Sequence, residues 1–551
     1  MPDSNLLGLI PADARRVVEI CDDRPSNARE SASQRATHYR RINPRGEYLT
    51  IACDRHASDV VEPAIVEQSV DCLVFDRTLT QVFDPLKLLQ SSARWLSENG
   101  QVVACIPNVQ YWHHLVYLLR GLGLEQGTNF DNCQLRFFSL ETIKKLFNQA
   151  GLNLYEVQTV GVQTEAFKEF AHTLSPVVKE LGLDPQTFAT QANTESYLVR
   201  ASKTESPPRR LFVHTILMAP TACDRPRVLD PDRLSNTIPG VRAIAEVKNA
   251  DLSLALPQEE KVFIWQRTIL KYPHDFARLR ELLRRDYLII AEIDDDPLRR
   301  PQYEQNRFLS YRGCHGVQTS TEPLADYLRQ HNPNVAVFAN QLTELPPERS
   351  YKNDGTCTIF FGALNREADW EPIVGELNRV LGKYRDRVRV KVIHDRKFWN
   401  ALQSLEGDRK DFEAFCPYER YLEIMDECDL ALLPLTPTRV NSMKSDLKFL
   451  ECAGHGVAVL ASPVVYEHTI VEGKTGLIYR TVEEFGKHLE ALITDPLLRQ
   501  TLAQNAYRWV AENRLLCQHY RQRSEWYKQL RDRLPELNRQ LRDRLPELFA
   551  D

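Results

Sequence analysis

The strongest constraint on the fold is a repeated alternation between short apolar runs and helix-like segments. The runs are rich in β-branched residues and too short for ordinary helices, which is typical of buried strands in parallel sheets. We expect strands at residues 15–20, 47–52, 71–75, 101–106, 197–200, 211–218, 262–265, 287–293, 356–361, 389–393, 430–435 and 457–461. Helical spacing separates several of them. At residues 84–100, Asn99-Gly100 supplies a helix stop, and the helix at 139–150 opens with a Ser-x-x-Thr start. The alternation predicts an α/β chain of doubly wound, Rossmann-like units.

Polar breaks divide this alternation into three Rossmann-like units and a helical tail. The segment SKTESPPRR, which contains two adjacent prolines, is typical of a linker, and PERSYKNDG forms a second break. We therefore expect domains at 1–203, 211–350 and 351–515, with a linker at 204–210 and a tail at 516–551.

The tail contains a short internal repeat. QLRDRLPEL occurs at residues 529–537 and again at 540–548, a period of 11 residues that places both copies on one helix face. Pro535 and Pro546 argue against a single uninterrupted helix. A solvated extension is the favoured interpretation; a surface for a protein partner or for self-association is the alternative.

Composition excludes several classes of protein. No apolar run reaches the roughly 18 residues that a membrane span requires, and the first residues lack the pattern of a signal peptide. The formal net charge of -5 gives no general attraction to nucleic acid. The 12 cysteines are scattered without a C-x-x-C pair, so neither a zinc ribbon nor a disulfide framework is indicated. We expect a cytoplasmic protein without a metal site.

Two segments of the first domain are informative, VDCLVFDRTLTQVFDPLKLLQSSARWLSENGQVVACIPN and QLRFFSLETIKKLFNQAGL. Through them the domain resembles class I S-adenosylmethionine-dependent methyltransferases. The family's cofactor loop is glycine-rich, whereas here the first strand leads into CDDRP and no glycine occurs between Gly8 and Gly46. Glu19 and Asp54 are the acidic residues nearest to the positions where the family contacts its cofactor. A scaffold or docking module is favoured over a working methyltransferase, and S-adenosylmethionine binding is not expected.

Two segments of the rest of the chain are informative: DLALLPLTPTRVNSMKSDLKFLECAGHGVAVLASPVVYEHTIVEGKTGLIY, residues 429–479, and GALNREADWEPIV, residues 362–374. Through them residues 210–515 resemble GT-B glycosyltransferases of the group 1 (family 4-like) type. It implies two Rossmann-like domains that face a cleft, the second holding a nucleotide sugar and the first an acceptor. It also implies transfer that retains the anomeric configuration and requires no metal.

The donor-side site is predicted around a helix start after the strand at 430–435. The segment Asn441–Ser445 is expected to open a helix, whose free N–H groups suit a diphosphate. Lys444, Lys448 and Glu451 are spaced to share one helix face. The resemblance assigns Glu451 to the ribose hydroxyls, while Met443 stands where the family has an earlier glutamate. An ordinary solvated helix face is the alternative.

The loop after the strand at 356–361 supplies the other donor-side residues. Gly362, Asn365 and Arg366 lie there, and in the family this loop approaches the phosphates. Stabilising the charge of the leaving diphosphate is the main catalytic need, so Arg366 is the candidate, with Lys444 or Lys448 as its partner. A surface arginine without a role is the alternative.

The acceptor side is predicted at the end of the strand at 287–293. Asp294, Asp295 and Asp296 follow that strand, and ligands gather at the carboxyl ends of parallel strands. These acids are suited to position an acceptor hydroxyl, act as a base or hold a metal; Asp295 is the catalytic candidate. A helix cap before Pro297 is the alternative. His214 is expected to face the same cleft, with a buried structural histidine as the alternative.

Three functions are consistent with these residues. The leading hypothesis is a glycosyltransferase that moves a sugar from a nucleotide diphosphate to a hydroxyl of a glycan, lipid-linked or protein acceptor, in polysaccharide or glycoconjugate assembly. The second is a bifunctional enzyme that also methylates the glycan. The third is a non-catalytic assembly or binding protein.

Overall fold

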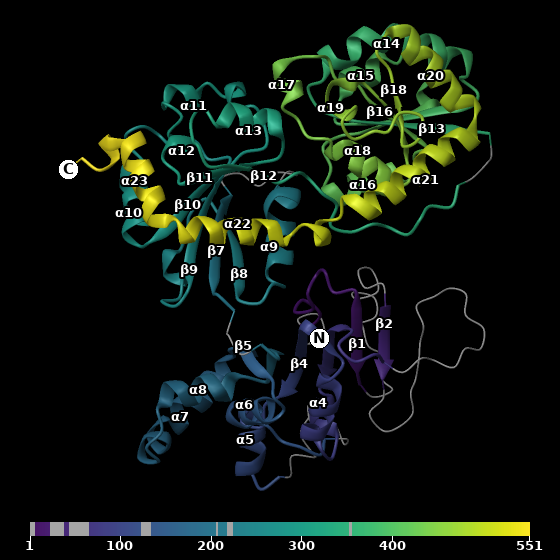
Figure 1. Ribbon diagram of the computed structural model, residues 1–551. Coiled ribbons are helices and arrows are strands. Elements are labelled where there is room, and N and C mark those ends of the chain that lie inside the picture. The colour runs from purple at the N-terminus through teal and green to yellow at the C-terminus, as the bar shows by residue number, and fades with distance from the viewer. Residues whose placement is uncertain are drawn as a thin grey trace, which may run out of the picture. The chain divides into compact units, whose positions relative to one another are not determined.

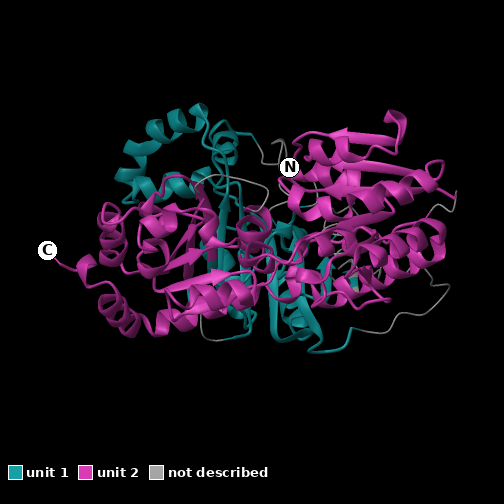
Figure 2. Cartoon of the chain, turned by 90° about the horizontal axis from the view of Figure 1, so that it is seen from above, with its two compact units in different colours: residues 1–210, 236–241 teal, residues 211–235, 242–551 magenta. Residues whose placement is uncertain are grey.

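The computed structural model describes residues 6–21, 38–42, 65–122, 134–204, 208–217, 224–351 and 355–550. The chain divides into two compact units, one of residues 1–210 and 236–241 and the other of residues 211–235 and 242–551 (Figure 2). Three six-stranded sheets, one in the first unit and two in the second, confirm the predicted α/β class with Rossmann-like units.

The first sheet has the strand order β2-β1-β3-β4-β6-β5. β6 runs antiparallel to both β4 and β5, while the pairings of β1 with β2 and β3, and of β3 with β4, are parallel. The strands are β1 Arg16–Ile20, β2 His38–Ile42, β3 Val70–Asp76, β4 Leu96–Pro107, β5 Asn153–Val160 and β6 Ser196–Ser202. The helices are α3 Thr78–Gln81, α4 Pro85–Ala93, α5 Trp112–Leu119, α6 Leu140–Gln149, α7 Glu165–Glu180 and α8 Pro185–Asn193.

In the first unit, one predicted helix start is confirmed and one predicted helix end is wrong. Ser139 caps α6 in a capping box with Thr142, as the Ser-x-x-Thr pattern predicts. The helix predicted to reach Gly100 ends instead at Ala93, because β4 begins at Leu96. The strand expected at 47–52 lies outside the described residues, as does Asp54.

We call the domain predicted at 211–350 the acceptor domain and the one predicted at 351–515 the donor domain, after the roles that the resemblance implies. The second sheet, in the acceptor domain, has the order β12-β11-β10-β9-β7-β8. The pairings of β9 with β7 and β10, and of β11 with β10 and β12, are parallel, and β7 and β10 are buried along their whole length. The strands are β7 Leu211–Leu217, β8 Val241–Val247, β9 Glu260–Gln266, β10 Tyr287–Glu292, β11 Gly316–Thr319 and β12 Val335–Val337. The helices are η2 Arg225–Leu229, α9 Asp230–Ser235, η3 Leu252–Leu254, α10 Phe276–Arg284, η4 Pro297–Arg299, α11 Gln302–Gln305, α12 Leu309–Arg312 and α13 Glu322–Leu328.

The third sheet, in the donor domain, has the order β15-β14-β13-β16-β17-β18, and its pairings are parallel. One apolar core joins it to α14, α15 and α20, and a second joins it to α16 and α18 (Figure 1). The strands are β13 Cys357–Gly362, β14 Val388–Ile393, β15 Lys410–Glu413, β16 Leu430–Leu433, β17 Ala458–Ala461 and β18 Leu477–Ile478. The helices are α14 Glu367–Lys383, α15 Arg396–Ala401, η5 Gly407–Arg409, α16 Tyr418–Asp426, α17 Arg439–Ser442, α18 Leu447–Gly454, α19 Pro463–Tyr466, α20 Val482–Thr494 and α21 Pro496–Asn513.

The tail packs onto the acceptor domain, so the favoured interpretation of a solvated extension is wrong. It comprises η6 Leu516–Gln518, α22 Arg521–Asp532, α23 Leu534–Arg544 and η7 Pro546–Leu548. The tail runs alongside the second sheet and its helix α10 (Figure 1). The two copies of the repeat bury equivalent leucines, namely Leu530, Leu534 and Leu537 in the first and Leu541, Leu545 and Leu548 in the second. The tail breaks at both prolines, as predicted. Burial of an apolar face explains why the period is close to three helical turns.

Candidate functional site

A cavity of about 300 Å³ lies where the acceptor and donor domains of the second unit meet. Its wall is formed mainly by residues at or just beyond the carboxyl ends of β9, β10, β13 and β16, where parallel sheets usually bind ligands. The acceptor domain contributes Pro226, Arg267, Asp294, Asp295 and Asn340, and the donor domain contributes Phe361, Gly362, Ala363, Arg366, Leu432, Leu433, Pro434, Leu435, Lys444, Ser445, Leu447, Lys448 and Tyr466.

Arg366 lies on the wall in a fixed orientation. It precedes α14, and its Nη1 donates both to Asp369 Oδ2 at 3.1 Å and to Asn441 Oδ1 at 3.0 Å. Asn441 in turn donates to Asp369 Oδ1 at 2.7 Å, and Thr436 donates to the same oxygen. Asp369 and Asn441 are buried, so Arg366 is braced by a network that excludes water. Asn441 belongs to this network and is absent from the cavity wall.

Gly362 and Lys448 form the adjoining part of the wall. A Cβ on Gly362 would meet the rings of Phe360 and Tyr421 at 2.6 Å, so a side chain does not fit there. Lys448 Nζ donates to the Gly362 carbonyl and, at 3.2 Å, to the Tyr421 hydroxyl. Asn365, predicted to contact the donor, is exposed, has a φ of 54° and does not line the cavity.

Glu451 lies behind this wall. It is 4% exposed, and its Oε1 accepts a hydrogen bond of 2.8 Å from the Tyr418 hydroxyl. Burial raises the pKa of the Glu451 carboxyl, while Lys448 and the Tyr418 hydroxyl act in the opposite direction. The predicted ribose contact stays a prediction, and Glu451 is not among the residues that line the cavity.

Lys444 reaches the cavity from a turn and not from the predicted helix face. α17 ends at Ser442 and α18 begins at Leu447, so only Lys448 and Glu451 of the predicted trio share a helix. Asp446, immediately before α18, accepts two hydrogen bonds from Arg514, at 2.8 and 2.9 Å.

An ion pair between Lys444 and Asp295 links the two domains at the cavity. Lys444 Nζ lies 3.6 Å from Asp295 Oδ1. Burial and the nearby Arg366 lower the pKa of Lys444, while Asp295 opposes them. Burial acts to raise the pKa of Asp295, but Lys444 and Arg299 outweigh it and hold that pKa below its ordinary value. Asp295 is therefore ionised near neutral pH.

The other two aspartates have partners of their own. Arg267 Nε donates to Asp294 Oδ1, and Asp296 Oδ1 accepts from the Leu298 amide at 3.0 Å. Asp296 thus caps η4, so the alternative of a helix cap is correct for this residue; its Oδ2 also lies 3.2 Å from Arg439 Nε. Among the described residues, no group of three or more His, Cys, Asp or Glu side chains is arranged to hold a metal ion.

His214 does not reach the cavity. It lies in the middle of β7, is 0% exposed, and its Nε2 is 2.5 Å from Glu246 Oε2. The rings of Phe212 and Phe263 flank it, and burial lowers its pKa. The expectation of an acceptor-side histidine is wrong, because a strand position three residues before the end of β7 lies within the sheet's core.

Sequence reasoning missed Arg267 and Asn340. Arg267 follows the end of β9 as the aspartates follow β10, so the same rule of strand ends identifies it. Asn340 donates to Ser445 Oγ at 2.8 Å and accepts from the buried Arg227 at 2.9 Å, and no local motif announces this contact.

The first unit has a different environment near the end of its first strand. The buried Glu19 carboxylate accepts from the Tyr39 hydroxyl, and Arg41 Nε lies 3.8 Å from it. The loop that would hold a cofactor, residues 22–37, lies outside the described residues.

One comparison with known proteins concerns the domain that contains the third sheet. Residues 371–528 match a family model described as glycosyl transferase-like. The second unit thus combines the region that matches this model with a preceding Rossmann-like domain, and a cavity lies where the two domains meet. No curated protein sequence matches the chain. Among the described residues, none of the helices has the length and apolarity that a membrane span requires.

Solved structures resemble the chain weakly. The Anabaena protein HepE, in complex with UDP and glucose, is 13% identical over 58% of this chain and 100% of its own, with a TM-score of 0.43. Sucrose-phosphate synthase from Thermosynechococcus elongatus is 12% identical over 58% of this chain and 99% of its own, with a TM-score of 0.42. S. aureus TarM is 10% identical, with a TM-score of 0.37; the match covers 49% of this chain and 55% of TarM. Scores at this level carry no argument about activity.

Proposed function

We propose that the chain transfers a sugar from a nucleotide diphosphate sugar to an acceptor hydroxyl. The observation that carries this proposal is the convergence of Arg366, Lys444 and Lys448 on one cavity, opposite the ionised Asp295. Three cations on the donor side suit a diphosphate, which gains negative charge when its bond to the sugar breaks. The same cations supply charge neutralisation without a metal, in line with the GT-B resemblance, which also implies retention of configuration.

Each residue has a role that follows from its position. Arg366, braced by Asp369 and Asn441, stabilises the leaving diphosphate without having to reorganise. Lys448 lies beside the Gly362 carbonyl and neutralises the adjacent phosphate. Asp295 has a lowered pKa, so it holds a proton poorly and is better suited to orient the acceptor hydroxyl than to keep its proton.

The acceptor is a glycan, a lipid-linked sugar or a protein, and polysaccharide or glycoconjugate assembly in the cytoplasm is the proposed setting. The first unit is proposed to be a scaffold and not a second catalytic domain. Its Glu19 side chain is 1% exposed, and its Oε2 accepts from Tyr39 and lies 3.8 Å from Arg41, so the carboxylate is poorly accessible to a cofactor.

Release of nucleoside diphosphate tests the proposed transfer. The full chain is incubated with UDP-, GDP- and ADP-sugars and a mixture of simple sugar acceptors, and both the nucleoside diphosphate and the glycoside are measured. We expect one nucleotide series to give both products in equal amounts. Absence of turnover with every donor, from protein whose folding has been verified, overturns the proposal.

A further inference from the structure

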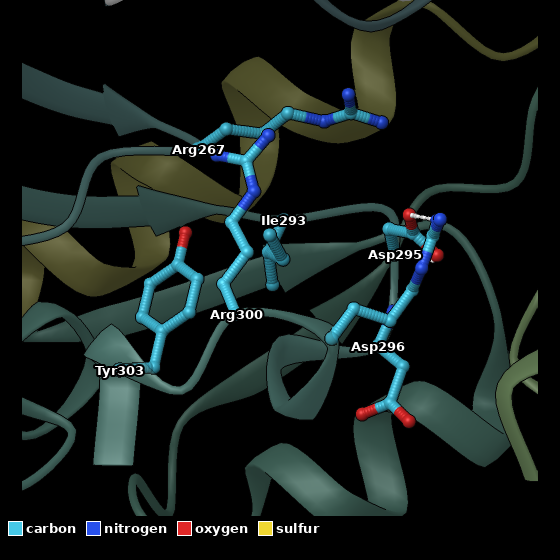
Figure 3. A pocket seen from close by; sticks show the side chains of 7 residues that line it. Arg267, Ile293, Asp295, Asp296, Arg300 and Tyr303 are labelled. Atoms are coloured by element: carbon cyan, nitrogen blue, oxygen red, sulfur yellow. Dashed lines mark hydrogen bonds and ion pairs between the residues drawn. The ribbon is translucent and has the colours of Figure 1, made fainter. Parts of the chain in front are cut away.

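A second hollow, of about 150 Å³, adjoins the reaction cavity on the acceptor side (Figure 3). The two share Arg267 and Asp295, so a ligand in one lies next to a ligand in the other. Arg299, Arg300 and Tyr303 form much of the remaining wall. We call this hollow the arginine pocket. Its smaller volume suits a substituent of the acceptor and not a nucleotide.

The charges around the arginine pocket sum to an excess of cations. Each aspartate is already neutralised: Asp294 by Arg267, Asp296 by Arg439, and Asp295 by both Arg299 and Lys444. In the part of the chain that the structure describes, no carboxylate lies within ion-pairing distance of Arg300. One guanidinium is therefore left without a counter-charge, beside two others.

The buried wall of the arginine pocket has an unsatisfied polar group. Tyr303 is 2% exposed, and its hydroxyl interacts with that of the stacked Tyr311 but forms no hydrogen bond of good geometry among the described residues. Figure 3 shows Arg300 and Tyr303 extending in the same direction, toward Arg267, with Asp295 and Asp296 on the other side of Ile293. A buried phenol without a well-formed hydrogen bond is costly, and an oxyanion would accept from both the phenol and the guanidinium.

We infer that the arginine pocket binds an oxyanion of the acceptor, a phosphate or a carboxylate carried close to the hydroxyl that is glycosylated. This inference rests on the proposed function, because an acceptor exists only if the chain transfers a sugar. It restricts the acceptor to molecules that carry an anionic group. Arg300 provides the uncompensated charge and Tyr303 the buried donor, while Asp295 at the shared wall faces the reacting hydroxyl.

Calorimetric titration of the full chain with glucose 6-phosphate, glucuronate and glucose, without nucleotide, tests the pocket. We expect at least one of the two anionic sugars to bind at least about tenfold more tightly than glucose, and Arg300→Gln to abolish that preference. Which sugar binds identifies the oxyanion as phosphate or carboxylate. Arg284→Gln, which changes a 70% exposed arginine elsewhere in the acceptor domain, is the matched control and should bind as the unaltered chain does.

A second variant separates the arginine pocket from the diphosphate site. Arg366→Gln should leave binding of the anionic sugar within about twofold. If Arg366→Gln abolishes binding and Arg300→Gln does not, or if the three sugars bind equally, the inference is overturned. Arg300-dependent binding in a chain that turns over no nucleotide sugar would retain the anion pocket and reject the proposed transfer, so the two failures are distinguishable.

Discussion

The first and third sheets have the same kind of edge, where a buried parallel strand ends, but the side chains there differ. After β13, Gly362 leaves no space for a side chain, and the cations that follow line a cavity. Near the end of β1, Glu19 is bonded to its neighbours on β2, and no glycine occurs between Gly8 and Gly46. One fold thus surrounds a cavity with cations in one domain and bonds a carboxylate internally in another, so function must be argued from the strand ends and not from the sheet.

The largest effect is expected for Arg366→Gln. Loss of the guanidinium removes charge stabilisation of the leaving diphosphate, so kcat/KM for transfer should fall about 100-fold or more. Steady-state kinetics with the best donor checks this. Arg389→Gln, at a 48% exposed arginine of the same domain, is the control. A loss below about threefold would remove Arg366 from the catalytic assignment.

A smaller effect is expected for Asp369→Asn, because Asp369 acts through Arg366. The substitution keeps the shape but removes the charge that fixes the guanidinium, so kcat should fall about tenfold while the Kd for nucleotide stays within about twofold. Asp411→Asn, at a 50% exposed position, controls for the loss of an acidic charge. If the variant is less stable and its kcat is unchanged once the unfolded fraction is subtracted, Asp369 has only a structural role.

Removal of Lys444 should lower the rate of transfer less than removal of Arg366 does, and it should also shift the pH dependence. Because Lys444 helps to hold the pKa of Asp295 below its ordinary value, Lys444→Met should raise that pKa. A depressed carboxyl pKa stabilises the fold above the unfolded pKa, and that stability is lost as pH falls through the folded pKa; without Lys444 the loss comes at higher pH. The acid limb of the kcat/KM profile should move upward in the same way, with Lys474→Met as the control. An unmoved limb would refute the coupling.

No binding is expected when S-adenosylmethionine is added to the chain, which is the smallest effect in this series. Calorimetric titration of the full chain should give no saturable heat, because Glu19 is engaged within the first unit. Saturable binding with a Kd in the micromolar range would abolish the contrast between the two edges and revive the bifunctional hypothesis.

Strands can be predicted from the sequence where their residues are apolar. Helix starts can be predicted where the capping residue lies next to the helix in sequence. The runs at 211–218 and 287–293 correspond to β7 and β10, and Ser139 forms the expected capping box. HYRRI, the sequence of β2, carries no apolar pattern and was not found. Gly100 resembled a helix stop, yet a Cβ there would meet the Val70 carbonyl oxygen at 2.7 Å, so the glycine serves close strand contact.

The site was predictable in its charges but not in its long-range contacts. Arg366, Lys444, Lys448 and Asp295 all line the cavity, because residues beyond strand ends gather at one edge. The role of Asn441 in bracing Arg366 depends on a partner 75 positions away. His214 looked chemically apt, but its burial within β7 could be seen only once the sheet was assembled.

Thermal denaturation of the full chain with a panel of nucleotide sugars tests the central claim most directly. A ligand at about 100 times its Kd stabilises the folded state by about 2.7 kcal/mol, which is readily detected as a higher Tm. The cavity predicts such a rise with one nucleotide series in the unaltered chain and a reduced rise in Lys448→Met. If no nucleotide sugar raises the Tm, or if Lys448→Met responds as the unaltered chain does, the assignment of the cavity as a nucleotide-sugar site is contradicted.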